Sequence, residues 1–93
     1  MKIALTGSSG LLGKEMVKSL EKLKIKYVPI KCRFDSIDLI TKNISESDFS
    51  HIFHFGVYKP KSFYSDLDEK IFYEENVLST IKLAKLAIKR DIK

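Results

Sequence analysis

Three glycines that directly follow a short apolar run near the start of the chain constrain its fold most strongly. The run Lys2–Thr6 (KIALT) predicts a buried parallel strand, and residues 10–24 predict a helix. The sequence TGSSGLLG at residues 6–13 joins the two. Glycines at such a junction allow a tight turn, a close approach of the backbone to a ligand, and close packing of helix on strand. This order predicts the first unit of an α/β fold.

The predicted helix has one apolar face, and the predicted strands continue the alternation. The face consists of apolar residues spaced by four, four and three positions, namely Leu12, Met16, Leu20 and Leu23. Residues 27–30 (YVPI) predict a second strand, with Pro29 best suited to an edge or a strand end. Residues 51–55 (HIFHF) form a near-continuous apolar run and predict a central strand.

The segments between these strands are less uniform. Residues 34–39 leave open either a short third strand or a turn, and Ile37, Ile40 and Ile44 favour a short helix that ends by Ser47. Residues 57–66 predict a loop. A long helix follows, with a predicted buried face at the apolar positions Val77, Ile81, Ala84 and Ile88. The last residues, 91–93, stand where another strand could begin. The fold class predicted is α/β, a Rossmann-like parallel sheet of order 3-2-1-4 with helices on both faces.

Composition and charge narrow the class of protein. The 93 residues suffice for one domain, and the single cysteine, Cys32, excludes an intrachain disulfide and fits a reducing cytoplasm. No apolar run has the length of a signal peptide core or a membrane span. The net charge of +5 is segmental, with +6 over residues 1–34, −5 over 35–75 and +4 over 76–93. Most lysines lie on polar sides of predicted helices, which favours solvated faces over a nucleic-acid-binding stripe.

The glycine turn is the strongest candidate for a binding site. A helix that begins near Gly10 presents free amide donors and the positive end of its dipole to an anion. We therefore expect a diphosphate to lie against this turn. The alternative is a glycine turn that joins strand and helix without any ligand.

The motif and several later stretches resemble one family. The spacing Gly-x-x-Gly-x-x-Gly after Thr6 resembles the short-chain dehydrogenase/reductase family, in its extended branch of sugar-nucleotide epimerases, dehydratases and reductases. Asp38-Leu39 resembles the family's adenine position, and His54-Phe55-Gly56 resembles its His-Leu-Ala after the fourth strand. Residues 72–80 (FYEENVLST) resemble its Asn-Val-x-Gly-Thr helix start, with Ser79 in place of glycine.

The resemblance implies a nicotinamide dinucleotide as cofactor and assigns its contacts. Those around the pyrophosphate are Gly7, Ser9, Gly10, Leu11, Leu12 and Gly13. Arg33 would lie near the adenosine ribose, Asp38 and Leu39 at the adenine, and Phe55 and Gly56 beside the nicotinamide ribose. After the second strand stand Lys31 and Arg33, where NAD-binding proteins have an acid. This cationic pair favours the 2′-phosphate of NADP, with NAD as the alternative.

The family's catalytic residues are not found in this chain. They are a tyrosine and a lysine four positions apart on a helix, with a nearby serine or threonine, after the fifth strand. Only Tyr27 has a lysine at that spacing, Lys31, and both fall at a predicted strand, which separates them by roughly 13 Å against about 6 Å on a helix. We therefore expect residues 1–93 to be a partial dinucleotide-binding domain that stops before the fifth strand and has no turnover alone.

Other functions and partners remain open at this level. The chain is either the cofactor-binding part of an enzyme that acts on nucleotide sugars, or a non-catalytic dinucleotide sensor or remnant of a disrupted gene. A basic nucleic-acid-binding module is a third alternative and predicts steep salt dependence. No catalytic or metal site is predicted, and His51, His54 and Cys32 are interpreted as structural. Without a fifth strand, residues 51–55 would be a bare apolar edge, which predicts self-association.

Overall fold

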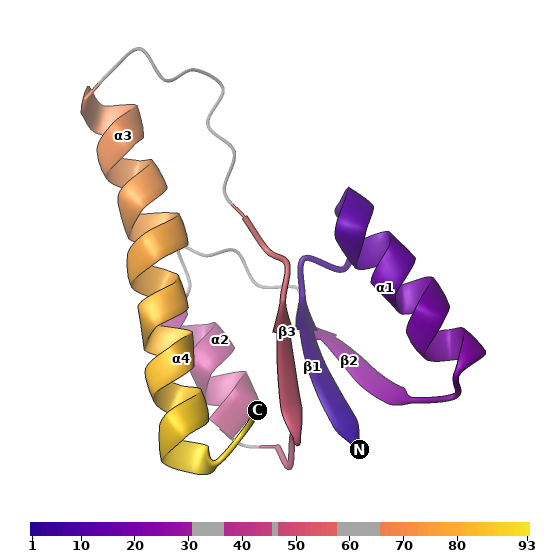
Figure 1. The fold of residues 1–93 in the computed structure, drawn as a ribbon. Helices are drawn as coiled ribbons and strands as arrows, with labels where there is room; N and C mark the ends of the chain where they lie inside the picture. Colours follow the sequence, from indigo (N-terminus) through magenta and orange to yellow (C-terminus); the bar gives the residue numbers. More distant parts are fainter. Residues whose placement is uncertain (31–36, 46, 58–65) are drawn as a thin grey trace.

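The computed structural model describes residues 1–30, 37–45, 47–57 and 66–93 (Figure 1). Strands and helices alternate along the chain, as the sequence predicts. The elements are β1 (Lys2–Thr6), α1 (Leu11–Lys22), β2 (Lys26–Ile30), α2 (Ile37–Ser45), β3 (His51–His54), α3 (Asp66–Phe72), η2 (Tyr73–Leu78) and α4 (Ser79–Arg90). None of the helices within these ranges is both long and apolar enough to cross a membrane.

The three described strands form a parallel sheet in the order β2-β1-β3. Lys2 of β1 pairs with Lys26 of β2, and Ile3 of β1 pairs with His51 of β3. This order confirms the predicted arrangement of the first, second and fourth strands, with the first in the middle. The predicted third strand falls at residues 34–39, of which 34–36 lie outside the described residues and 37–39 begin α2.

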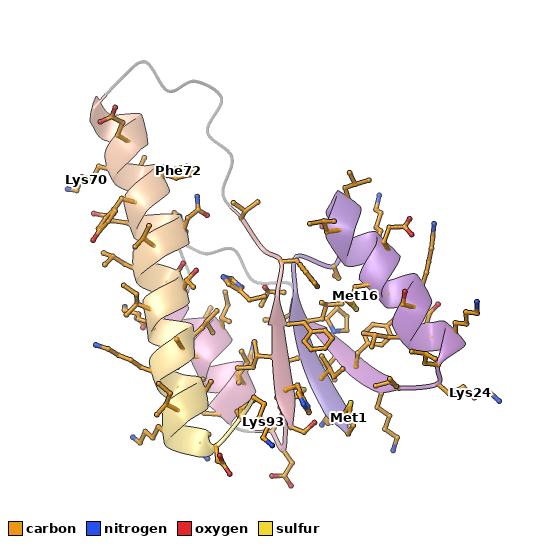
Figure 2. All side chains as sticks on the ribbon, viewed as in Figure 1. Met1, Met16, Lys24, Lys70, Phe72 and Lys93 are labelled. Atoms are coloured by element: carbon orange, nitrogen blue, oxygen red, sulfur yellow. The ribbon has the colours of Figure 1, made fainter. Side chains whose placement is uncertain are left out.

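Helices cover both faces of the sheet (Figure 1). On one face Ile3 and Leu5 of β1 pack with Leu20 of α1 in a buried cluster, and Met16 lies against it (Figure 2). The opposite cluster combines strand residues with α2 and α4. Its buried members are Ala4, Ile30, Ile40, Ile44, Phe49, Leu83 and Ile92. Alternating β1 residues thus serve the two clusters, since successive strand side chains point to opposite faces. These observations confirm the predicted fold class.

The buried face of α1 differs from the predicted one at both ends. Met16 and Leu20 pack toward the sheet as expected, but Leu12 and Leu23 are 68% and 67% exposed. The helix instead places Gly13 in the buried position of its first turn. Because this glycine lets the first turn approach the strand closely, the inward face follows Gly13, Met16 and Leu20, and Leu12 points away.

The predicted buried face of the long helix is wrong. The segments α3, η2 and α4 form one continuous helix, in which Val77, Ile81 and Ile88 are 39%, 43% and 81% exposed. Ser79 and Leu83 are buried instead, and α4 packs against α2. The helix carries two apolar stripes, and periodicity does not tell which of them faces the core. The π-helical segment η2 also widens the turn before α4, which shifts the faces of the two parts relative to each other.

The end of the chain pairs with β3. Lys93 donates its amide to Ser50 O at 3.0 Å, and its carbonyl oxygen accepts from Ile52 N at 2.7 Å. This is the hydrogen-bond pattern of a parallel neighbour, so Lys93 lies beside β3 at the position of an adjacent strand. The edge of β3 is therefore not bare over residues 50–52, contrary to the expectation of a fully open edge.

Candidate functional site

The turn after β1 is built around the positive φ angle of Gly7. Its φ of +71° lies in the left-handed region that favours glycine. A Cβ atom at Gly7 would stand 2.5 Å from Gly56 N and 2.5 Å from the carbonyl carbon of Phe55. The turn after β1 is thus packed directly on the backbone that follows β3. Only glycine satisfies both the conformation and the contact.

Gly13 fixes the start of α1 against the same turn. A Cβ atom at Gly13 would lie 1.8 Å from Gly7 O, a distance that no packing allows. The third glycine of the motif is therefore required for the helix to approach the strand, as the sequence predicts.

Gly10 is different, because the described protein does not fill the space at its side. A Cβ atom there would meet only Gly7 O, at 3.5 Å, an ordinary contact. Its φ of −77° and ψ of 173° are open to any residue. Packing within the described chain thus gives no reason for a glycine here. A ligand that approaches the backbone closely would give one.

The first turn of α1 presents its amides beside this space. Gly10 is the N-cap, and no side-chain cap bond is made there, nor does the first turn hold an acid. The amide of Lys14 bonds to Gly10 O at 2.9 Å, which begins the helical pattern. The amides of Leu11, Leu12 and Gly13 come before any intrahelical acceptor. The side chains of Leu11 and Leu12 are 84% and 68% exposed, so they do not fold over the turn as core residues would.

Phe55 and Gly56 lie beside the glycine turn, as expected for one site. The amide of Phe55 donates to Thr6 O at 3.2 Å, and the amide of Gly56 donates to Thr6 Oγ1 at 3.1 Å. The side chain of Phe55 packs on the cluster of Ile3, Leu5 and Leu20. The carboxyl ends of β1 and β3 are thereby joined, and in parallel α/β sheets this end of the strands is where ligands bind.

The other predicted contact residues are not brought to the turn in the same way. Asp38 and Leu39 lie in the first turn of α2, and both side chains are exposed. Asp38 Oδ1 stands 3.8 Å from Lys82 Nζ on α4, an exposed ion pair. Ser9 is exposed within the glycine turn. Lys31 and Arg33, which carry the predicted cofactor preference, lie outside the described residues.

Tyr27 is engaged on the strand β2 and not on a helix. Its hydroxyl donates to Glu21 Oε1 at 2.8 Å. This hydrogen bond is the main cause that raises the pKa of the Tyr27 hydroxyl above its ordinary value. Because Tyr27 lies in a strand, its four-residue spacing to Lys31 is not the helical spacing of the catalytic pair. Within the described ranges, no group of three or more His, Cys, Asp or Glu side chains is placed to hold a metal ion.

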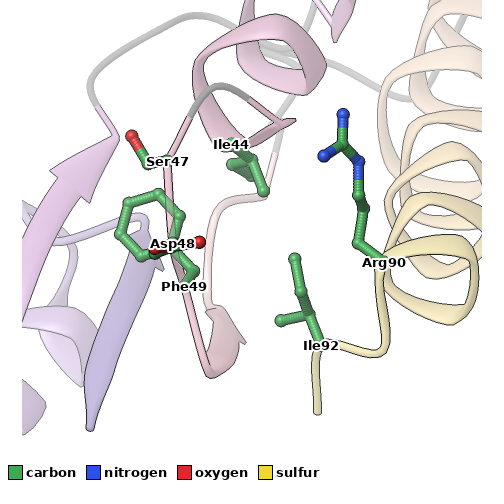
Figure 3. A pocket seen from close by; sticks show the side chains of 6 residues that line it. All are labelled: Ile44, Ser47, Asp48, Phe49, Arg90 and Ile92. Atoms are coloured by element: carbon green, nitrogen blue, oxygen red, sulfur yellow. The ribbon is translucent and has the colours of Figure 1, made fainter.

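A pocket lies at the opposite end of the sheet (Figure 3). It encloses about 90 Å³ and is lined by Ile44, Ser47, Asp48, Phe49, Arg90 and Ile92. Phe49 comes just before β3, so the pocket is at the amino ends of the strands. Ligand pockets usually enclose about 300–1,000 Å³, and a dinucleotide needs more room than this pocket offers.

Three side chains near the turn were not predicted as site residues. Thr6 Oγ1 lies 2.6 Å from His54 Nδ1, and His54 Nε2 lies 3.1 Å from Thr80 Oγ1. Thr6 and His54 are register partners at the carboxyl ends of neighbouring strands. Their pairing could have been inferred from the predicted sheet order, which sets the last residues of β1 and β3 side by side. Thr80 comes from α4 and had no local signal.

The fold is similar to that of several proteins of known structure. The UDP-rhamnose synthase of Acanthamoeba polyphaga mimivirus matches 99% of the chain at 21% identity, with a TM-score of 0.82. A UDP-glucose 4-epimerase of Thermus thermophilus, solved in complex with NAD, matches 100% at 14% identity, with a TM-score of 0.81. A short-chain dehydrogenase/reductase superfamily protein of Agrobacterium tumefaciens, with bound NAD, matches 100% at 17% identity, with a TM-score of 0.80.

The chain spans only 34%, 35% and 30% of the length of these three proteins, in the same order. No protein-family model matches the sequence, and no curated protein matches it. At these identities the likeness shows a shared fold. The chain has the Rossmann-like α/β architecture of part of each of these proteins.

Proposed function

We propose that this chain binds a nicotinamide dinucleotide, with the diphosphate on the amides of Leu11, Leu12 and Gly13. We further propose that it is the cofactor-binding part of an extended short-chain dehydrogenase/reductase that acts on nucleotide sugars. Two of the three similar structures described above hold NAD. The parallel sheet and the glycine turn at its carboxyl end support the same conclusion.

The observation that carries the proposal is the open space at Gly10. Gly7 and Gly13 are explained by contacts within the protein, because a Cβ atom at either would overlap backbone. Gly10 has no such contact within the described chain and adopts an ordinary conformation. A diphosphate seated on the first-turn amides would occupy the space that a side chain at Gly10 would otherwise take.

The remaining contacts follow from this placement. Ser9 would donate to the diphosphate, and the Phe55–Gly56 backbone would line the nicotinamide ribose. Asp38 and Leu39 are proposed at the adenine, and Arg33 at the adenosine ribose. A guanidinium pairs with a phosphate through charge-assisted, often bidentate hydrogen bonds, so Arg33 favours NADP over NAD.

The bound dinucleotide would supply hydride transfer. The residues of this chain would bind and orient it, and a proton-transfer pair of tyrosine and lysine would have to come from residues beyond these 93. We accordingly expect no turnover from these residues alone. The single cysteine favours a reducing cytoplasm as the location.

Calorimetric titration with NADP and NAD tests the proposal directly. We expect both to bind and NADP to bind more tightly. In Gly10→Ala the added methyl group would meet Gly7 O at 3.5 Å and leave the fold intact, yet obstruct the diphosphate. We expect this variant to bind at least about tenfold more weakly, a loss of about 1.4 kcal/mol.

The matched control is Ser19→Ala, an exposed change on the same helix that should bind as the parent does. Absence of binding by the parent chain, or equal binding by Gly10→Ala, would contradict the proposed site. Tighter binding of NAD than of NADP would contradict only the role of Arg33.

A further inference from the structure

A chain of hydrogen bonds runs from the backbone after β3 to the long helix through a histidine. The Gly56 amide donates to Thr6 Oγ1 at 3.1 Å, and Thr6 Oγ1 lies 2.6 Å from His54 Nδ1. On the other side of the ring, His54 Nε2 lies 3.1 Å from Thr80 Oγ1. Thr80 Oγ1 in turn donates to Asn76 O at 2.6 Å. One imidazole thus connects β1, β3 and the start of α4.

The hydroxyl groups determine where the imidazole proton lies. Thr80 has a single hydroxyl proton, which goes to Asn76 O, so Thr80 Oγ1 accepts a hydrogen bond from His54 Nε2–H. Thr6 Oγ1 already accepts from Gly56, and Thr6 is only 2% exposed, so its hydroxyl proton needs a protein acceptor. His54 Nδ1, at 2.6 Å, is that acceptor when the ring is neutral. Neutral His54 with its proton on Nε2 is the form that fits the contacts with both Thr6 and Thr80.

This series of hydrogen bonds reaches the candidate site through the Gly56 amide. Gly56 lies against Gly7, since a Cβ atom at Gly7 would stand 2.5 Å from Gly56 N. The orientation of Thr6 Oγ1 therefore sets how the backbone after β3 lies on the glycine turn. His54 is a neighbour of Thr6 in the sheet register and determines which way that hydroxyl points.

We propose that His54 is a positioning residue, which as a neutral imidazole holds Thr6 on the Gly56 amide and keeps the two turns in binding geometry. The part that concerns dinucleotide affinity rests on the proposed function. The link from His54 to Gly56 does not. Protonation of His54 would turn Nδ1 into a hydrogen-bond donor. The Thr6 hydroxyl would then have to rotate its O–H away from Nδ1.

The surroundings of His54 favour its neutral form. Burial lowers the pKa of the His54 imidazole below its ordinary value. Each ring nitrogen lies within hydrogen-bond distance of a threonine hydroxyl, Thr6 at Nδ1 and Thr80 at Nε2. The described elements that carry Thr6, His54 and Thr80 also carry titratable groups, which include Lys2 on β1, His51 on β3, Glu75 on η2 and Lys82 on α4, where Lys82 pairs with Asp38.

The direction of the pH effect follows from this lowered pKa. Below about pH 6.5 the unfolded chain binds a proton at His54 more readily than the folded chain does. The stabilising contribution of the neutral ring is therefore complete above that pH and is lost as the pH falls through this region.

Nuclear magnetic resonance of the full chain tests the link without any ligand. The chain has two histidines, and His51→Gln assigns their ring signals. We expect His54 to show the Nε2–H tautomer at pH 8, and the amide signal of Gly56 to follow the titration of His54 and not that of His51. An Nδ1–H tautomer, or a Gly56 amide that ignores the titration, would overturn the proposal.

Dinucleotide titration tests the consequence for binding. We expect the parent chain to bind NAD, whose diphosphate keeps its charge over this range, several-fold more weakly at pH 5 than at pH 8, because the lowered pKa of the His54 imidazole opposes protonation in the binding geometry. In His54→Asn the amide oxygen can take the place of Nδ1 and does not titrate. This variant should bind within about threefold of the parent at pH 8 and lose its pH dependence.

His54→Leu lacks the acceptor and should bind about tenfold more weakly at both pH values. The control His51→Gln should keep the pH profile of the parent. A folded His54→Leu with parental affinity, or a pH dependence that persists in His54→Asn, would overturn the proposal. If the parent binds no dinucleotide, the proposed function fails while the resonance experiment still decides the link.

Discussion

The two ends of the sheet differ in what covers them. At the carboxyl end, the first-turn amides of α1 precede any intrahelical acceptor, and Leu11 and Leu12 are exposed. At the amino end, Ile44, Phe49 and Ile92 are buried and close around a small pocket. The amino end, despite its small pocket, is thus part of the packed core. The carboxyl end, with the first-turn amides of α1, has donors that could bind an anion.

The largest expected effect is a loss of stability that distinguishes Gly13 from Gly10, the two glycines at the start of α1. Gly13→Ala should lower the free energy of unfolding by more than about 4 kcal/mol, because its methyl group would overlap Gly7 O and force α1 away from the strand. Urea denaturation followed by circular dichroism measures this loss. Gly10→Ala serves as the control and should lose less than about 1 kcal/mol. Equal stability of the two variants would contradict the packing role of Gly13.

An intermediate effect is expected at the amino end. Ile44 is completely buried between α2 and the sheet, so Ile44→Ala should lower the free energy of unfolding by about 3 kcal/mol through a cavity. Ile44→Val removes less and should lose about 1 kcal/mol. Calorimetry on the folded protein should give unchanged dinucleotide affinity for both. A weakened affinity in the folded Ile44→Val variant would mean that the two ends are coupled.

The smallest effect is expected for the charged residue that lines the pocket. Arg90→Ala removes an exposed guanidinium in the last turn of α4, which should change stability by less than about 1 kcal/mol. Dinucleotide affinity should stay within the error of the titration. A clear loss of affinity would move the binding site to the amino end and break the comparison.

The local elements were predictable because their signals are local. The strand Lys2–Thr6 has the bounds that its apolar run predicts, and the helix around Ile40 and Ile44 ends before Ser47 as expected. The glycine turn and the Phe55–Gly56 segment were predicted at one site and do lie together. The inward faces of α1 and α4 were predicted less well. Both helices have apolar residues around more than one face, and only their neighbours select which face is buried.

The amino-acid sequence alone determined the alternation of strands and helices, the tight turn at Gly7 and the close contact at Gly13. These depend on backbone conformation and on periodicity, which are properties of short segments. The tertiary structure decided that Leu83 and not Ile88 faces the core, and that His54 meets Thr6 and Thr80. Such contacts join residues distant in the chain, and they exist only once the parallel sheet has set its strands in register and the long helix has packed against it.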